Sequence, residues 1–266
     1  MPVQAEWVRF EGYSGYLARP AGVAGPLPGV VLIQEIWGVD EHIEDVARRL
    51  AAAGYATLAP DLFAANGARP EPLARERVAE VKAFMARLAG GGWDPGVWSA
   101  GIAELPADQR ERMDASRGAL MGSLGNLDRY LPALQASARH LRQAEPGQKV
   151  GCVGFCMGGG LSALLACEDP ELAASAIFYG SAPPLERVPR IACPVMGFYA
   201  GLDAKVNAGV PAFSEAMAAA GKTFTAHTYE GAAHAFFNDT RGVYHVGAAR
   251  DSFARLLEFY RACLAP

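Results

Sequence analysis

The residues best suited to chemistry are centred on a cysteine flanked by glycines, Gly154-Phe-Cys156-Met-Gly158. An apolar run ending at Phe155 precedes this cysteine and a glycine-rich segment follows it, which is typical of a strand, a sharp turn and a helix. Such a turn, the nucleophile elbow, presents its central side chain at the top of a parallel sheet. Serine usually occupies that position. A thiol there indicates acyl-transfer chemistry, with the helix N-terminus favouring the reactive thiolate.

A cysteine nucleophile needs a base that takes its proton and an acid that orients the base. Asp203 directly follows the apolar segment 194–200, and His234 follows the segment 223–229. A lone aspartate or histidine after a strand is more often structural. Here the three residue types each follow their own strand, in the chain order that elbow folds use. The sequence therefore predicts a triad of Cys156, His234 and Asp203.

Stabilisation of an acyl-transfer oxyanion needs two N–H donors near the nucleophile. The expected donors are the backbone N–H of Met157, after the elbow, and that of Ile36, after an early strand. Glu35, beside Ile36, is unusual because a carboxylate at the mouth of an apolar strand is costly unless it is paired. It is either a structural salt bridge or cap, or it holds the thiol proton or faces the substrate.

The other cysteines and histidines suggest no further chemistry. The cysteines lie mostly in apolar segments and are interpreted as small buried hydrophobes, and the histidines show no metal-ligand spacing and are interpreted as surface or packing residues. We therefore expect no metal and no cofactor. These residues are Cys152, Cys167, Cys193, Cys263, His42, His140, His227 and His245.

Strand-length apolar runs alternate with helix-period segments, which predicts an α/β fold with a mostly parallel, doubly wound sheet and helices on both faces. A helix is expected from Asp40, its N-cap, to Ala53, with Gly54 just beyond it. The expected strands are Trp7–Phe10, Gly15–Arg19, Gly29–Gln34, Tyr55–Ala59, Lys149–Phe155, Ala174–Tyr179, Val195–Ala200 and Thr223–Tyr229.

Two later helical segments complete the prediction. A final helix is expected to bury one stripe, and the region around 70–145 reads as a helical insertion near the top edge of the sheet. No linker or repeat divides the chain, so residues 1–266 are expected to form one domain. The buried stripe is predicted to hold Val246, Phe253, Leu257, Tyr260 and Leu264.

Composition limits the possible partners. The 266 residues carry a net charge of −4 with no long Lys/Arg cluster, which disfavours a nucleic-acid surface. We find neither a secretory signal nor an apolar run of membrane length, and the odd number of cysteines, five, fits reduced thiols. The expectation is a cytoplasmic protein, monomeric or a small homo-oligomer, that acts on a small molecule, with no nucleic-acid or membrane partner.

With these residues in place, the chain resembles the dienelactone hydrolase (carboxymethylenebutenolidase-like) family of the α/β-hydrolase superfamily. The resemblance spans about residues 15–264. It is carried by Gln34-Glu-Ile-Trp-Gly38, Pro60-Asp-Leu-Phe63, Gly154-Phe-Cys-Met-Gly-Gly159, Gly201-Leu-Asp203 and Gly231-Ala-Ala-His-Ala-Phe236. It implies a Cys156–His234–Asp203 triad, and a Glu35 that contacts the resting thiol and is displaced as substrate binds.

The substrate pocket departs from the family pattern. Relatives acting on dienelactone hold its carboxylate with arginines, one of them four residues after the catalytic histidine, and here that position is Asn238. The candidates for another arginine are Arg69, Arg75 and Arg77. Trp37, Phe236 and Asn238 are expected to contact the substrate.

The sequence thus predicts a cysteine-dependent hydrolase of lactones or small carboxylic esters that acts through an acyl-enzyme. Two alternatives remain open. One is a broader carboxylesterase or thioesterase for activated esters, and the other is a non-catalytic ligand-binding or redox-sensing member of the fold, with Cys156 as an oxidisable switch.

Overall fold

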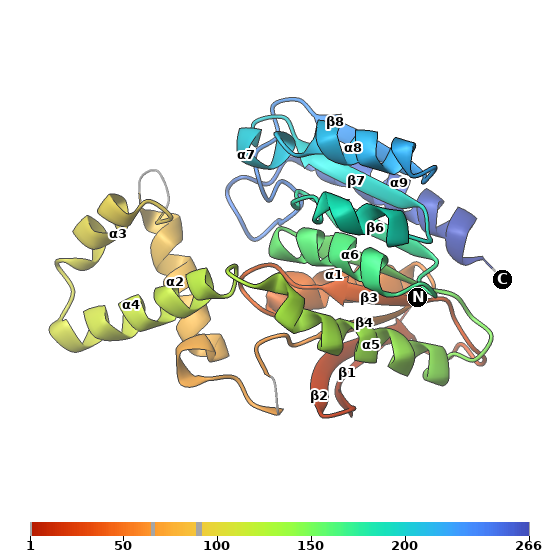
Figure 1. The fold of residues 1–266 in the computed structure, drawn as a ribbon. Coiled ribbons are helices and arrows are strands. Elements are labelled where there is room, and N and C mark those ends of the chain that lie inside the picture. Colours follow the sequence, from red (N-terminus) through yellow and green to blue (C-terminus); the bar gives the residue numbers. More distant parts are fainter. Residues whose placement is uncertain (1, 65–66, 89–91, 266) are drawn as a thin grey trace.

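The fold is built on one twisted eight-stranded sheet, in a computed structural model that describes residues 2–64, 67–88 and 92–265. The strand order is β1-β2-β4-β3-β5-β6-β7-β8 (Figure 1). The pairs β1–β2 and β2–β4 are antiparallel and all other pairs are parallel, which confirms the predicted mostly parallel sheet. The strands are β1 (Val3–Phe10), β2 (Tyr13–Pro20), β3 (Gly29–Ile33), β4 (Ala56–Pro60), β5 (Val150–Phe155), β6 (Ala174–Phe178), β7 (Val195–Ala200) and β8 (Phe224–Tyr229).

Helices cover both faces of the sheet and create two hydrophobic cores. One core lies under α5, α6 and α8, and the other lies under α1 and α9. The residues of β3 and β5 are buried throughout because both faces are covered. The helices are α1 (Glu41–Ala52), α2 (Arg75–Arg87), α3 (Pro95–Ile102), α4 (Ala107–Gly122), α5 (Leu131–Ala144), α6 (Met157–Glu168), α7 (Ala204–Asn207), α8 (Val210–Ala219) and α9 (Val246–Leu264), with short 3₁₀ turns η2 (Glu71–Leu73), η3 (Leu127–Tyr130) and η4 (Leu185–Arg190).

Helix α1 begins at the N-cap that the sequence predicted. Asp40 is the N-cap, and its Oδ1 accepts a hydrogen bond from the N–H of Ile43 at 3.2 Å. The helix ends at Ala52, and Gly54, two residues further on, has a φ of 104° that other residues rarely adopt. The N-cap bond anchors the end of the loop that leads from β3 to α1 past the site described below.

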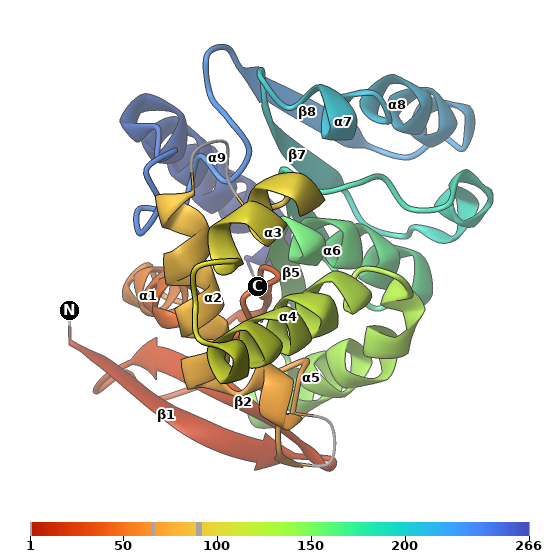
Figure 2. The same ribbon diagram turned by 90° about the vertical axis from the view of Figure 1, so that its left-hand side faces the viewer.

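The segment 70–145 divides into two parts. Helices α2, α3 and α4 project from the body of the molecule on the side where the parallel strands end (Figures 1 and 2). Helix α5 instead packs against β3 and β4, as an ordinary crossover helix does. The predicted insertion is therefore real but shorter than 70–145, because its last helix belongs to the sheet layer.

The predicted stripe of the final helix is wrong in part. The buried face of α9 contains Ser252, Leu256, Tyr260 and Leu264, whereas Val246 is 63% exposed. Two small residues, Ala248 and Ala249, take the buried positions in the first turn. A pattern search for large apolar residues misses this face because close approach to the sheet there favours small side chains.

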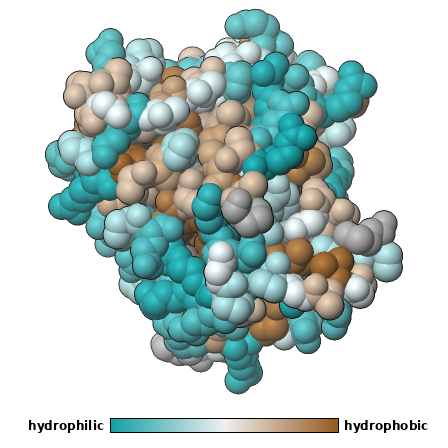
Figure 3. All heavy atoms as spheres, turned by 90° about the vertical axis from the view of Figure 1, so that its right-hand side faces the viewer, coloured by the Kyte–Doolittle hydropathy of each residue, from teal (hydrophilic) through white to brown (hydrophobic). Residues whose placement is uncertain are grey.

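No helix within the described ranges is long and apolar enough to cross a bilayer. The face opposite the projecting helices shows hydrophilic side chains around an apolar central area (Figure 3).

Candidate active site

Cys156 occupies a strained turn between β5 and α6. Its φ of 56° and ψ of −115° lie in a region that non-glycine residues rarely adopt. The turn is held by a hydrogen bond from the Cys156 N–H to the carbonyl of Phe178 at 3.0 Å. Such strain persists only where the surroundings enforce it, and it is common at functional sites.

The glycines around the turn are required by close backbone contacts. A Cβ on Gly154 would lie 1.8 Å from the carbonyl oxygen of Gly158. A Cβ on Gly158 would lie 2.4 Å from the carbonyl oxygen of Ile33. The absence of these side chains lets α6 start directly against β3 and β5, which places Cys156 at the carboxyl edge of the sheet.

Asp203 and His234 meet at the same edge, as the sequence predicted. Asp203 follows β7, and its Oδ1 accepts the N–H of Val206 at 3.3 Å in the first turn of α7. Its Oδ2 lies 2.5 Å from Nδ1 of His234, which follows β8. The carboxylate therefore fixes the imidazole in the tautomer that keeps Nε2 available for another partner.

The electrostatics of the pair favour a charged imidazole. Partial burial acts to lower the pKa of His234, but the hydrogen bond to Asp203 and the nearby Cys156 sulfur, together with their charge, raise it to about 10. Burial acts to raise the pKa of Asp203, but its contact with His234 gives a net lowering. The arrangement suits an imidazolium between a carboxylate and a sulfur.

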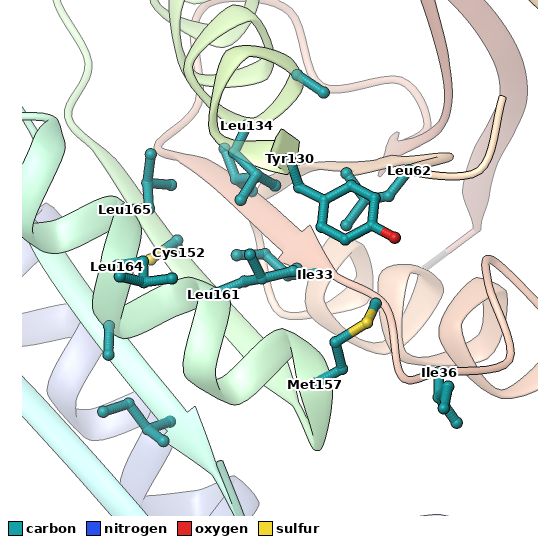
Figure 4. Packing of buried hydrophobic residues seen from close by; sticks show 14 of the residues in the cluster. Ile33, Ile36, Leu62, Tyr130, Leu134, Cys152, Met157, Leu161, Leu164 and Leu165 are labelled. Carbon is teal, nitrogen blue, oxygen red and sulfur yellow. The ribbon is translucent and has the colours of Figure 1, made fainter. Parts of the chain in front are cut away.

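Ile36 and Met157 lie on neighbouring segments, at the end of β3 and the start of α6 (Figure 4). Met157 is the first residue of α6, so its N–H is among those with no acceptor inside the helix. The tight passage of α6 over the backbone of Ile33 and Gln34 brings these two segments together. Their N–H groups are the candidates for an oxyanion hole.

Glu35 is buried, with 2% of its surface exposed. Its Oε1 accepts the Tyr179 hydroxyl at 3.2 Å and its Oε2 accepts Nδ2 of Asn238 at 2.7 Å. Within the described residues no cation lies within salt-bridge distance of this carboxylate. Glu35 is therefore a buried acid with two uncharged donors, and the salt-bridge interpretation does not apply to it.

Tyr179 was not predicted as a site residue. It follows β6 with a φ of 40°, and its ring packs edge-on against His234 with centroids 5.1 Å apart. Burial, together with the adjacent Glu35, raises the pKa of Tyr179 well above its usual value, so the hydroxyl remains a donor. Its position at the carboxyl end of β6 was the available sequence signal, since that edge also carries Cys156 and Asp203.

The three expected substrate contacts lie deeper than expected. Phe236 is fully buried and packs against Tyr179 and Tyr229, so its surface faces other aromatic rings. Asn238 is also fully buried, and its side-chain NH₂ group donates a hydrogen bond to Glu35. Trp37 is 3% exposed and lines a cavity whose described lining does not include Cys156, Asp203 or His234. In this conformation Trp37 is the one of the three that faces open space.

That cavity has a volume of about 780 Å³ and lies between the loop after β3, helix α2 and residues 240–243. Arg241 lines it with its guanidinium 5.7 Å from the centre of the Trp37 ring. Within the described part of the chain Arg241 has no carboxylate partner. It was missed in the sequence because it lies three residues beyond the position where the family arginine is expected.

Of the arginines considered from the sequence, Arg69 and Arg75 line this cavity and Arg77 is not among its lining residues. Arg75 is paired with Glu44 at 2.5 Å. Arg69 is 7% exposed and bonds Asp61 at 2.7 Å, while its second terminal nitrogen, Nη2, is buried without a partner. A Cβ on Gly38 would lie 2.7 Å from that nitrogen, so the glycine admits the guanidinium beside Trp37.

The fold and site define an α/β-hydrolase. A crystal structure of a "Putative Dienelactone Hydrolase" from Klebsiella pneumoniae superposes with a TM-score of 0.73 at 26% identity, over 98% of this chain and 99% of that one. Similarity of this extent covers the projecting helices as well as the sheet.

The chain belongs to the dienelactone hydrolase family, whose sequence model matches residues 13–264. A relative from Saccharolobus solfataricus is 34% identical over 256 residues, covering 92% of both chains. A relative from Escherichia coli O157:H7 is 31% identical over 257 residues, covering 92% of this chain and 81% of that one. Both carry the name "Putative carboxymethylenebutenolidase". Family membership makes the protein a hydrolase of the carboxylic ester class.

Proposed function

We propose that the protein is a cysteine-dependent hydrolase of lactones or small carboxylic esters that acts through an acyl-enzyme on Cys156. The observation that carries this proposal is the alignment of Asp203, His234 and the Cys156 sulfur at one sheet edge. A carboxylate, an oriented imidazole and a nucleophile in that order form the arrangement used for acyl transfer.

The proposed cycle starts from a Cys156 thiolate beside protonated His234. The thiolate attacks the carbonyl carbon, and the N–H groups of Ile36 and Met157 stabilise the oxygen that becomes negative. His234 then gives its proton to the leaving alkoxide or enolate, which leaves an acyl-thioester on the enzyme. Neutral His234 next takes a proton from water, and the resulting attack releases the acid and restores the thiolate.

Glu35 is proposed to receive or return the thiol proton during substrate binding. Its burial beside the loop of Ile36 keeps it next to the oxyanion donors, and its two donors are uncharged. A carboxylate held without a cation has less to lose on protonation than one in a salt bridge. This supports a role in proton transfer over a purely structural one.

The cavity lined by Trp37 supports a substrate with an acidic group. Arg241 and the free Nη2 of Arg69 both lie against the Trp37–Gly38 segment, directly after the proposed oxyanion donor Ile36. A guanidinium without a partner is suited to a carboxylate. We therefore propose that Arg241 takes the part that Asn238, at the family position, cannot take because it is buried and neutral.

The broader esterase or thioesterase function differs only in its substrate, and the same triad supports it. The non-catalytic sensor is less well supported, because an oxidisable thiol does not need an imidazole oriented by a carboxylate. Substrate preference therefore distinguishes the lactone hydrolase from the broader esterase or thioesterase. Formation of an acyl-enzyme would exclude the non-catalytic sensor.

A substrate panel with trapping of the intermediate tests the proposal. Lactones with and without a carboxylate, p-nitrophenyl esters and an acyl thioester would be assayed, with rapid acid quench and intact-protein mass spectrometry. We expect turnover of lactones and an added acyl mass that maps to the peptide containing Cys156. An acyl mass on another residue, or none across the panel, would refute the cysteine mechanism.

A further inference from the structure

We propose that Asn238 and Thr240 are positioning residues that connect Lys82 of the projecting helix α2 to Glu35. The side chains form a continuous hydrogen-bonded chain that we call the Lys82–Glu35 relay. Its members are residues 82, 240, 238 and 35, which come from three segments far apart in sequence. This inference rests on the proposed function only in assigning Glu35 to the reacting site.

The direction of each bond is fixed by chemistry. The ammonium of Lys82 has only donors, and it donates to Thr240 Oγ1 at 3.1 Å. The Thr240 hydroxyl therefore directs its single proton elsewhere, to Oδ1 of Asn238 at 2.7 Å. Because Oδ1 also accepts the Thr240 N–H at 3.0 Å, the amide NH₂ of Asn238 must face Glu35.

The chain is polarised toward the carboxylate. Lys82 is anchored by Asp40, the α1 N-cap, at 2.7 Å, which holds the ammonium in place beside Thr240. Two hydrogen bonds to the side-chain oxygen Oδ1 of Asn238 draw electron density from the NH₂ group of the same amide. The resulting bond to Glu35 Oε2 is 2.7 Å, at the short, charge-assisted end of the N–H···O range.

The relay explains how a fully buried asparagine can support a buried acid. Asn238 is 0% exposed and Glu35 is 2% exposed, so water does not replace a lost bond. Removing the amide would leave one carboxylate oxygen without a donor, which is costly in a buried site. Glu35 would then interact with another proton in place of the lost donor. The proton that the proposed cycle makes available to it is that of the Cys156 thiol.

The relay also joins the projecting helices to the active site. Lys82 and Thr240 both line the cavity beside Trp37, so a ligand there contacts the relay at its charged end. An anionic group in the cavity competes with Thr240 for the ammonium, which weakens the hold on Glu35. Occupancy of the cavity and release of Glu35 are thereby coupled.

The test compares Thr240→Val, which removes the hydroxyl at similar volume, with Thr240→Ser, which keeps it. We expect Thr240→Val to lower kcat by roughly 3- to 10-fold with KM little changed, and Asn238→Leu to lower it by roughly 10- to 100-fold. Thr240→Ser should remain near the parent value. Circular dichroism and melting curves establish that each variant folds.

A double-mutant cycle separates positioning from a structural role. In a Glu35→Gln background, Thr240→Val should have less than about a 2-fold effect, because it acts through the carboxylate. The pH dependence of the rate at which iodoacetamide alkylates Cys156 should shift in Thr240→Val and should not shift in Thr240→Ser. An equal effect of Thr240→Val in both backgrounds, or no effect of Asn238→Leu, would overturn the relay. Loss of the cysteine mechanism would show separately, as activity retained in Cys156→Ala.

Discussion

Asp203 and His234 are separated by 31 residues, and Oδ2 of the aspartate lies 2.5 Å from Nδ1 of the histidine. This contact makes a specific prediction for Asp203→Asn. The amide oxygen can keep the cap on Val206, but the negative charge is lost. We expect kcat to fall by roughly 10³- to 10⁴-fold, as when the acid of a comparable triad is neutralised.

Steady-state kinetics with an activated ester measure this effect. Asp251→Asn is the control, because Asp251 pairs with Arg255 on the surface. Equal activity of the two variants would remove Asp203 from the mechanism.

His234 makes the stability depend on pH in a defined direction. Its pKa rises from 6.5 to about 10 on folding, because the bonds and charges of Asp203 and Cys156 outweigh desolvation. A raised pKa stabilises the fold fully below the unfolded value, and that contribution is lost as pH rises through about 10. The stability difference between the parent protein and His234→Gln should therefore be larger at pH 6 than above pH 10.

Urea unfolding at both pH values measures that difference. His227 provides a control of opposite sign, since desolvation lowers its pKa. A lowered histidine pKa favours the neutral form in the fold, so its contribution is lost as pH falls below the folded value. His227→Gln should therefore relieve a loss of stability at acidic pH. The same pH trend in both variants would contradict the assignment of the His234 shift.

The elbow predicts a sharp difference between two glycines of α6. A Cβ on Gly158 would lie 2.4 Å from a backbone oxygen, whereas one on Gly160 would meet its nearest neighbours at 3.6 Å. Gly158→Ala should lower the free energy of unfolding by about 3 kcal/mol or more. Gly160→Ala should be near neutral, or stabilising by up to about 1 kcal/mol from helix propensity. Chemical unfolding of both variants measures this, and similar stabilities would contradict the tight packing of the elbow.

Arg241 is predicted to select substrates by charge. Replacing it with Met should raise KM for a carboxylate-bearing lactone by roughly 10- to 100-fold, the size of a lost bond to a charged group. For a neutral lactone KM should change by less than about 2-fold. Arg255→Met is the matched control, because Arg255 is exposed and pairs with Asp251 on the surface. An equal change for both lactones would refute recognition of the acid by Arg241.

Much of the site could be predicted because its residues follow strands. Cys156, Asp203 and His234 each come directly after an apolar run, and parallel strands bring such positions to one edge. The partners of Glu35 could not be predicted in this way. Tyr179 and Asn238 lie 144 and 203 residues away, and only the packed fold brings their donors to one carboxylate.

The errors have a similar origin. Asn238 was expected at the substrate because it lies four residues after His234, but it is fully buried, and the chain passes through a positive φ of 66° at Ala235 just after the histidine. In α9 the buried face contains alanine and serine, which carry little apolar signal. Local pattern thus predicts which edge a residue reaches, and tertiary packing decides which way its side chain faces.

The most direct test of the central claim compares Cys156→Ala with Cys152→Ala. Cys152 lies in β5, four residues before Cys156, and it is fully buried with a pKa that desolvation raises to about 11, so it is no nucleophile. The measurement is kcat/KM for a lactone substrate with each folded variant. We predict that Cys156→Ala loses essentially all activity and that Cys152→Ala keeps most of it. Equal activity in the two variants would contradict Cys156 as the nucleophile.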